Sequence, residues 1–135
     1  MTEYTSAIQQ IPYPAERVFS KLSDLNNLES VKSLLDGKIK DFTFNSDSCE
    51  FKVDPIGTVG IRVVEREPFT TIKLESVKSP IEFQGWIQLK EIAPNDTRLK
   101  LTFRADIPFF LKSMISSKLE EGINTVASML AKLPY

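Results

Sequence analysis

The chain has 135 residues, of which 41% are hydrophobic and 26% are charged, a composition that predicts one globular domain spanning residues 1–135. The 17 basic and 18 acidic residues give a net charge of -1, which argues against a nucleic-acid partner because such proteins carry a basic surface. A single cysteine and no histidine exclude an internal disulfide, a cysteine-based zinc site and the catalytic arrangements that use histidine as general base.

The sequence has no apolar run of bilayer length and no charged-then-apolar leader. We therefore expect no stable membrane insertion and no secretion, and the expected location is the cytoplasm. No motif indicates a metal or another cofactor, and no residue pattern identifies a catalytic group. Any catalysis would have to use carboxylates, lysines, tyrosines or bound water.

The N-terminal quarter of the chain predicts one strand followed by two short helices. Residues 2–11 are rich in threonine, tyrosine and isoleucine, as strands are, but Ile8 and Ile11 are out of phase and indicate a bulge. A first helix is expected over residues 13–22 because apolar residues recur there at helical spacing. The same spacing predicts a second helix over residues 25–35, which a glycine then ends.

Between Lys38 and Ile107 the hydrophobic period changes from 3.6 to 2, which predicts six consecutive strands. Turn-forming residues separate them, so neighbouring strands are expected to be antiparallel, with one face buried and the other in water. The expected strands cover residues 40–44, 49–53, 59–67, 69–77, 81–90 and 98–107.

The last segment, Pro108–Leu133, predicts a single long helix of about 39 Å. Apolar residues at steps of three and four form one face, and Phe110 and Met114 are expected to widen that face near the helix start. Gly122 interrupts the apolar face, and we interpret it, like Gly85 in the middle of a strand, as a mark of close approach or of open volume. The predicted class is therefore α+β, with a curved antiparallel seven-stranded sheet wrapped around a long C-terminal helix and two short helices after the first strand.

The residues at both ends resemble a known family. Ile11–Phe19 followed by Leu22–Leu28 is similar to the opening of START-like (SRPBCC) proteins, and Ile107–Leu133 is similar to their closing helix. This superfamily includes birch pollen allergen-like proteins and polyketide cyclases, and its architecture is called the helix-grip fold. The resemblance implies an apolar or amphipathic small molecule held between sheet and helix, and in some members a cyclisation or dehydration carried out there.

Large apolar side chains on the predicted inner face are the candidate ligand-binding residues. A strongly bent sheet and a straight helix cannot touch along their whole length, so some of these residues are expected to line a cavity. A filled core is the alternative interpretation for each position. The candidates are Phe42, Phe44, Phe51, Ile61, Val63, Ile72, Leu74, Phe83, Ile87, Leu101, Phe103, Phe110 and Met114.

Three functions remain open at this stage. The favoured one is binding or carriage of a small hydrophobic or amphipathic ligand, without catalysis. The second is a cyclase or dehydratase that uses the same cavity, with a carboxylate or a tyrosine such as Tyr4 or Tyr13 moving protons. The third is an interaction module with a filled core, which would pair with a partner or a second copy through the outer sheet face near Trp86.

Two further polar residues are given structural roles. Asp24 is interpreted as a helix cap and Cys49 as inert packing.

Overall fold

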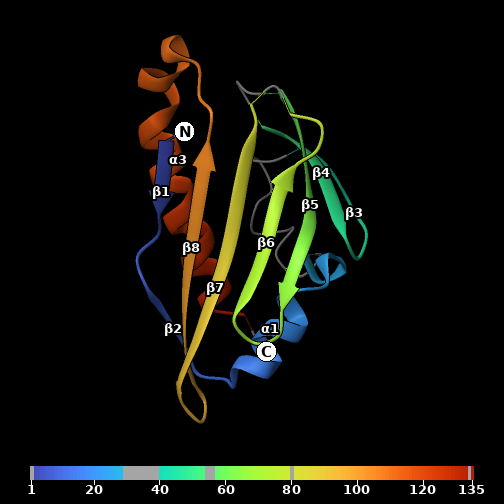
Figure 1. Ribbon diagram of the computed structural model, residues 1–135, viewed down its shortest axis with the longest axis vertical. Coiled ribbons are helices and arrows are strands. Elements are labelled where there is room, and N and C mark those ends of the chain that lie inside the picture. The colour runs from blue at the N-terminus through green and yellow to red at the C-terminus, as the bar shows by residue number, and fades with distance from the viewer. Residues whose placement is uncertain (1, 29–39, 54–56, 80, 134) are drawn as a thin grey trace.

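The computed structural model describes residues 2–28, 40–53, 57–79, 81–133 and 135. One eight-stranded antiparallel sheet forms the body of the molecule, with strand order β1-β8-β7-β6-β5-β4-β3 and with β2 also beside β8 (Figure 1). The strands are β1 (Thr2–Thr5), β2 (Gln9–Ile11), β3 (Lys40–Phe44), β4 (Ser48–Val53), β5 (Gly57–Glu67), β6 (Thr71–Ser76), β7 (Phe83–Ala93) and β8 (Asp96–Ala105).

The helices are α1 (Ala15–Leu22), the short 3-10 helix η1 (Leu25–Leu28) and α3 (Phe109–Ala131). The predicted α+β helix-grip class and the order of elements are confirmed. The part of the second predicted helix beyond Leu28 lies outside the described residues. No helix among the described residues is long and apolar enough to cross a bilayer.

The predicted strand count of seven is wrong by one because the first strand is divided. Thr5 lies opposite Thr102 and Gln9 lies opposite Leu99, so β1 and β2 together carry one residue more than the matching stretch of β8. Ser6 lies in the interruption, where its backbone N–H donates to the Leu101 carbonyl and its Oγ accepts from the Leu101 N–H, both at 2.9 Å. The bulge that the phase of the two isoleucines indicated is thus present.

The register confirms which side chains share the inner face of the sheet. Phe83 lies opposite Ala105, Ile87 lies opposite both Leu101 and Ile72, and the same parity continues across the sheet. We call inner face the positions Phe42, Phe44, Cys49, Phe51, Val59, Ile61, Val63, Ile72, Leu74, Ser76, Phe83, Gly85, Ile87, Leu89, Leu99, Leu101, Phe103 and Ala105.

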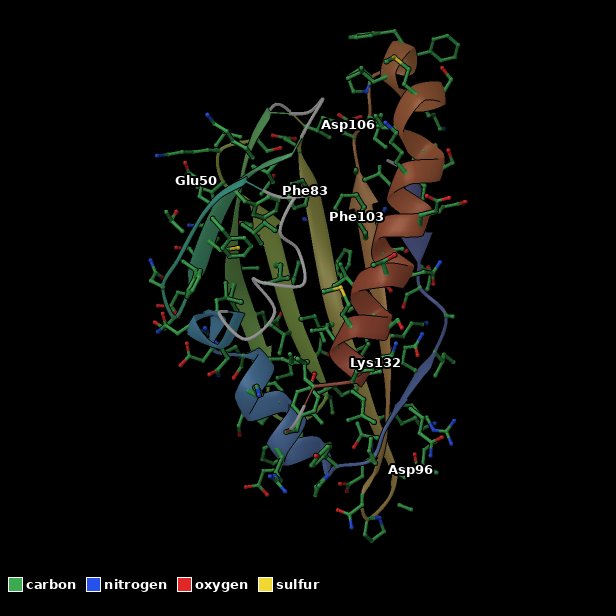
Figure 2. The ribbon with its side chains drawn as sticks, turned by 180° about the vertical axis from the view of Figure 1, so that it is seen from behind. Glu50, Phe83, Asp96, Phe103, Asp106 and Lys132 are labelled. Carbon is green, nitrogen blue, oxygen red and sulfur yellow. The ribbon has the colours of Figure 1, made fainter. Side chains whose placement is uncertain are left out.

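The long helix α3 lies against one side of this face. Its contacts with the sheet are concentrated on β8, β1 and β2, and Figures 1 and 2 show it along that edge. Its first turns stand beyond the end of β8, at the end of the molecule opposite the β7–β8 turn. The described strands β3 to β6 therefore lie away from the helix.

The buried side chains form two separate clusters instead of one continuous core. One cluster joins α1 and the end of α3 to the sheet and contains Ile11, Val18, Phe19, Leu22, Ile72, Leu89, Leu99, Leu101, Ala127, Leu130, Leu133 and Tyr135. The other joins the first half of α3 to the sheet and contains Val59, Ile81, Phe83, Ala105 and Ile115. The molecule is thus packed at both ends.

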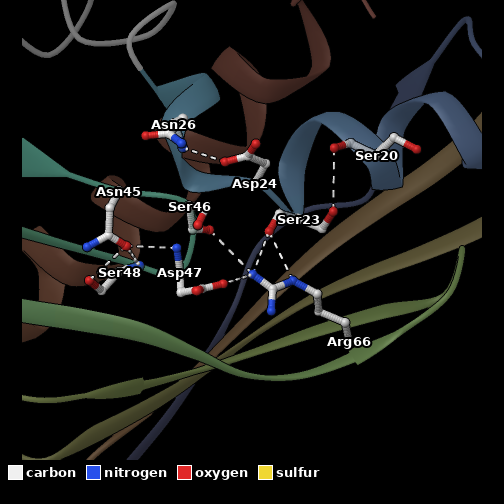
Figure 3. Close-up of polar contacts among 9 residues, drawn as sticks. All are labelled: Ser20, Ser23, Asp24, Asn26, Asn45, Ser46, Asp47, Ser48 and Arg66. Atoms are coloured by element: carbon white, nitrogen blue, oxygen red, sulfur yellow. Dashed lines mark hydrogen bonds and ion pairs between the residues drawn. The ribbon is translucent and has the colours of Figure 1, made fainter.

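A second bulge, which the sequence did not indicate, turns Arg66 toward α1. Val63 lies opposite Leu74 and Glu65 lies opposite Lys73, so Val64 is the extra residue and Arg66 falls opposite the inner-face residue Ile72. The Arg66 guanidinium reaches the hairpin between β3 and β4 and the end of α1 (Figure 3).

Three groups accept from this guanidinium. The Ser23 carbonyl at the end of α1 accepts at 3.0 and 3.1 Å, the Ser46 carbonyl at 3.3 Å and Asp47 Oδ1 at 2.8 Å. A cation beside the last carbonyls of a helix is also favoured by the helix dipole. Arg66 thus ties α1, the β3–β4 hairpin and β5 together.

Replacing Arg66 should lower stability more than replacing the exposed Arg62, which among the described residues pairs only with Glu75. We expect Arg66→Met to lower the free energy of unfolding by about 1–2 kcal/mol, after allowing for partial solvent exposure. Arg62→Met should change it by less than about 0.5 kcal/mol. Urea titration monitored by circular dichroism measures both, and equal losses would contradict the role given to Arg66.

Of the two interpretations of Gly122, close approach is wrong and open volume agrees with the structure. A Cβ added at Gly122 would meet no atom of the described chain within 4 Å. Gly122 follows Ile115 by seven residues and so lies on nearly the same side of the helix, yet Ile115 is 2% exposed and Gly122 is exposed. Space therefore adjoins the middle of α3 on the side that its first half buries.

Because nothing crowds this position, Gly122→Ala should raise the free energy of unfolding by about 1 kcal/mol, the difference in helix propensity. Thermal unfolding followed by calorimetry measures the change. A clear loss of stability would instead mean that a neighbouring element packs closely on this side of α3.

Candidate functional site

Three phenylalanines from β3 and β4 form an aromatic group on the part of the inner face far from α3. The Phe42 ring lies 5.5 Å from that of Phe44 and 5.7 Å from that of Phe51, and the latter pair is stacked. All three are half-buried. They offer an apolar surface whose rings are partly open to solvent.

A second aromatic group lies on the side of the inner face that α3 covers. The Phe83 and Phe103 ring centroids are 5.1 Å apart, and Figure 2 shows both between the sheet and the helix. Tyr4 from β1 lies 6.3 Å from Phe103, and its hydroxyl shares a 2.7 Å hydrogen bond with Ser116 Oγ of α3. This pair places a polar group beside the apolar surface.

The predicted residues of the central strands divide between buried and half-buried. Ile72 is 0% and Leu101 8% exposed, and both belong to the core beside α1. Four other positions are half-buried although the register turns them all inward: Val63, Leu74 and Ile87, which pack against the core beside α1, and Ile61, which packs against the other cluster. Inward-facing apolar side chains that keep solvent exposure indicate a face that is incompletely covered.

Phe110 and Met114 do not join this face. They are 74% and 59% exposed, so the expectation that they widen the buried side of the last helix is wrong. That expectation assumed sheet beneath the whole helix, whereas the first turns of α3 stand beyond the ends of the strands (Figure 1). Whether either residue touches a ligand stays a prediction.

The side of α3 on which Gly122 lies is also incompletely covered further toward the C-terminus. Val126 follows Gly122 by one turn, on the same side of the helix, and is 38% exposed. At Gly85, on the facing strand β7, an added Cβ would meet only ordinary contacts of 3.8 Å or more, with Thr102 and Leu74. Both glycines thus have room for a side chain, one on the helix and one on the sheet.

Charge is scarce on the inner face. From β4 to β8 the inner-face positions named above carry apolar side chains except for Gly85, Ser76 and Cys49. The same parity continues to Arg66 and Glu91, whose side chains bond to the backbone at the two ends of α1. Ser76 Oγ accepts from the Phe83 backbone N–H at 3.1 Å. Among the described residues no group of histidine, cysteine, aspartate and glutamate is arranged to hold a metal ion.

The carboxylates beside η1 and at the end of β5 have other roles or face solvent. Asp24 Oδ1 accepts from the Asn26 N–H at 3.0 Å, so Asp24 caps η1 as predicted. Glu65 and Glu67 are exposed. A capping group that sequence reasoning missed is Glu91, whose Oε1 accepts from the Ala15 N–H at 3.1 Å at the start of α1. The two residues are 76 positions apart, so no local pattern could reveal this contact.

A shallow depression of about 560 Å³ opens on the solvent side of α1. Polar side chains dominate its lining, which comprises Glu16, Arg17, Ser20, Lys21, Asn27 and Tyr135. Tyr135 donates a 2.6 Å hydrogen bond to the Leu130 carbonyl, and burial raises the pKa of this phenol. This depression does not coincide with the predicted apolar site. Tyr135, which is part of its lining, belongs to the core beside α1.

Trp86 lies on the outer face, as its sequence parity predicted. It is half-buried, opposite Lys73 on β6, and the Lys73 ammonium lies 5.7 Å from its ring centroid. This contact covers part of the ring and accounts for a large aromatic side chain on a solvent-facing sheet surface. A partner contact at this face stays a prediction.

Burial raises the pKa of the Cys49 thiol to about 11 from an ordinary value of 9.0. Only the thiolate reacts with alkylating reagents, so at pH 8 the folded protein should react roughly a hundredfold more slowly than the unfolded chain. Measuring iodoacetamide labelling in buffer and in urea checks this. Comparable rates in both would mean that Cys49 is accessible and ionises normally.

Comparison with known proteins finds no match among protein families or curated sequences. Several solved structures are similar. TTHA0849 from Thermus thermophilus has a TM-score of 0.70 and 18% identity, over 97% of this chain and 95% of that one. A START superfamily protein from Mycobacterium smegmatis has a TM-score of 0.66 and 13% identity, over 98% and 99%.

Norcoclaurine synthase from Thalictrum flavum, solved in complex with dopamine and hydroxybenzaldehyde, has a TM-score of 0.73 and 9% identity, over 97% of this chain and 86% of that one. At these identities the similarities establish the fold alone. They agree with the architecture built above from strand order, register and the position of α3.

Proposed function

We propose that this protein, which has the START-like (SRPBCC) helix-grip fold, binds a small apolar or amphipathic molecule between the inner face of its sheet and α3. The carrying observation is that Ile61, Val63, Leu74 and Ile87 point inward and yet remain partly exposed. A ligand on these side chains would remove apolar surface from water, at roughly 25 cal/mol per Å².

The dimensions of the elements support this location. Because β1 and β2 share one position beside β8, the sheet is seven strands wide. Seven strands about 4.8 Å apart span roughly 29 Å, whereas a helix with its side chains is about 10–12 Å across. One helix lying on β8, β1 and β2 therefore covers only part of the sheet. The two aromatic groups, around Phe51 and around Phe103, lie on opposite sides of the half-exposed positions.

Polar groups beside this surface favour an amphipathic ligand. The Tyr4 hydroxyl and Ser116 Oγ form a bridge between β1 and α3, next to Phe103. A ligand with one hydroxyl or carbonyl could exchange a hydrogen bond with this bridge while its apolar part lies on the strands. The ligand's orientation would follow from that contact.

Binding is better supported than catalysis. A cyclase or dehydratase would need a group that moves protons. The charged side chains at inward-facing positions of β4 to β8 are Arg66 and Glu91, and each is bonded to the backbone at one end of α1. At the other inward-facing positions of these strands the ionisable group is the Cys49 thiol, which is held neutral by burial. We further propose that residues 1–135 act as a single domain in the cytoplasm, with no nucleic-acid partner.

Filling the inner face tests the proposal. Gly85→Val places a branched side chain on this face, and Gln84→Val places the same side chain on the outer face of the same strand. With the apolar probe N-phenyl-1-naphthylamine, we expect Gly85→Val to weaken binding at least about tenfold and Gln84→Val to leave it unchanged.

Thermal stability keeps this test interpretable. Because valine suits a strand better than glycine and the added Cβ meets only ordinary contacts, Gly85→Val should leave stability unchanged or raise it by up to about 1 kcal/mol. Probe binding that is equal in the two variants, or absent from the unsubstituted protein, would refute the proposed site. A large loss of stability in Gly85→Val would also refute it, because the interior would then be full.

A further inference from the structure

The free end of α3 carries large apolar side chains that the described chain leaves uncovered. Phe109 is 94%, Phe110 74% and Met114 59% exposed, all within the first two turns of the helix. We call Phe109, Phe110 and Met114 the helix tip.

The helix tip projects, and its side chains point in different directions. Successive helical residues differ by about 100°, so Phe109 and Phe110 lie on different sides, while Met114 follows Phe110 on one side. Figure 1 shows that this part of α3 stands beyond the ends of the strands. A flat protein surface would cover one side of such a projection, whereas the interface of a bilayer surrounds whatever enters it.

The charges around the helix tip suit an anionic surface. From Phe109 to Leu119 the helix contains Lys112 and Lys118 and no acidic residue, and both lysines are exposed. Pro108 at its start provides no side-chain cap, so the positive end of the helix dipole is also directed outward. Asp106 lies beside the strand end and not at the free end of the helix (Figure 2).

We propose that the helix tip docks reversibly on an anionic lipid surface, with Phe109, Phe110 and Met114 entering the interface and Lys112 contacting the headgroups. Exposed aromatic and aliphatic side chains next to lysines are the combination that binds peripherally to such membranes. On another side of the same turns, Leu111 and Ile115 belong to the cluster that also contains Phe83 and Phe103, so docking would bring the inner face close to the bilayer. Docking does not require that a ligand bind there.

Vesicle flotation tests the docking. The full chain should float with phosphatidylcholine vesicles that contain about 30% phosphatidylserine, and weakly with pure phosphatidylcholine vesicles. The double variant Phe109→Ser/Phe110→Ser should lose affinity at least about tenfold. Lys112→Gln should lose about fivefold, and this loss should vanish at high salt because the contribution is electrostatic.

A matched control removes apolar side chains elsewhere. Ile8 and Ile92 are 65% and 57% exposed and lie outside the helix tip, so Ile8→Ser/Ile92→Ser should bind vesicles as the unsubstituted protein does. All variants change exposed side chains, and their melting temperatures should match.

Three results would overturn the proposal. They are equal flotation of the two double variants, no flotation of the unsubstituted protein, and a dimer in sedimentation that the helix-tip variant abolishes. The Gly85→Val variant should float normally, so failure of ligand binding and failure of docking are separable.

Discussion

The packing of α3 along one side of the sheet determines how the rest of the molecule is arranged. The helix buries Ile115, Ala127 and Leu130 and makes its main sheet contacts with β8, β1 and β2. A single helix is narrower than half of a sheet that is seven strands wide. The helix therefore cannot cover the inward-facing apolar side chains of the remaining strands. The half-buried state of Ile61 and Leu74 is the direct consequence.

The two ends of the molecule are built differently. At one end α1 is fastened by Glu91 at its first turn and by Arg66 at its last, and Tyr135 closes the core beside it. At the other end α3 begins with two exposed phenylalanines beyond the strands. The end at α1 is therefore closed by contacts within the chain, whereas the end at the start of α3 exposes apolar side chains to solvent.

Much of the fold follows from local pattern, and the exceptions have physical causes. Strict alternation from β3 to β8 predicted the strands, their antiparallel pairing and the inner face, because a period of two leaves little freedom of register. The bulge at Ser6 was foreseen from the phase of Ile8 and Ile11. The bulge at Val64 was not foreseen, because the residues after it, Glu65, Arg66 and Glu67, are all charged and no apolar residue marks which of them faces inward.

The candidate site was less predictable than the fold. Helical spacing groups Phe110 and Met114 with their neighbours but does not say how far the sheet extends beneath the helix. The exposure of Phe110 was therefore missed, and the choice between close approach and open volume at Gly122 was left open. Contacts between distant parts of the chain, such as Glu91 with Ala15, leave no trace in local spacing. Alternation along a strand is enough to assign a residue to one face of the sheet, and Phe83 and Phe103 were assigned to the correct face in this way.

Native mass spectrometry of the protein as purified tests most directly whether the inner face holds a guest. We expect a fraction of the protein to carry one additional small-molecule mass that organic solvent releases and that a mixture of apolar metabolites restores. A protein that carries only its own mass, and takes up none of the offered molecules, would contradict a binding site between the sheet and α3.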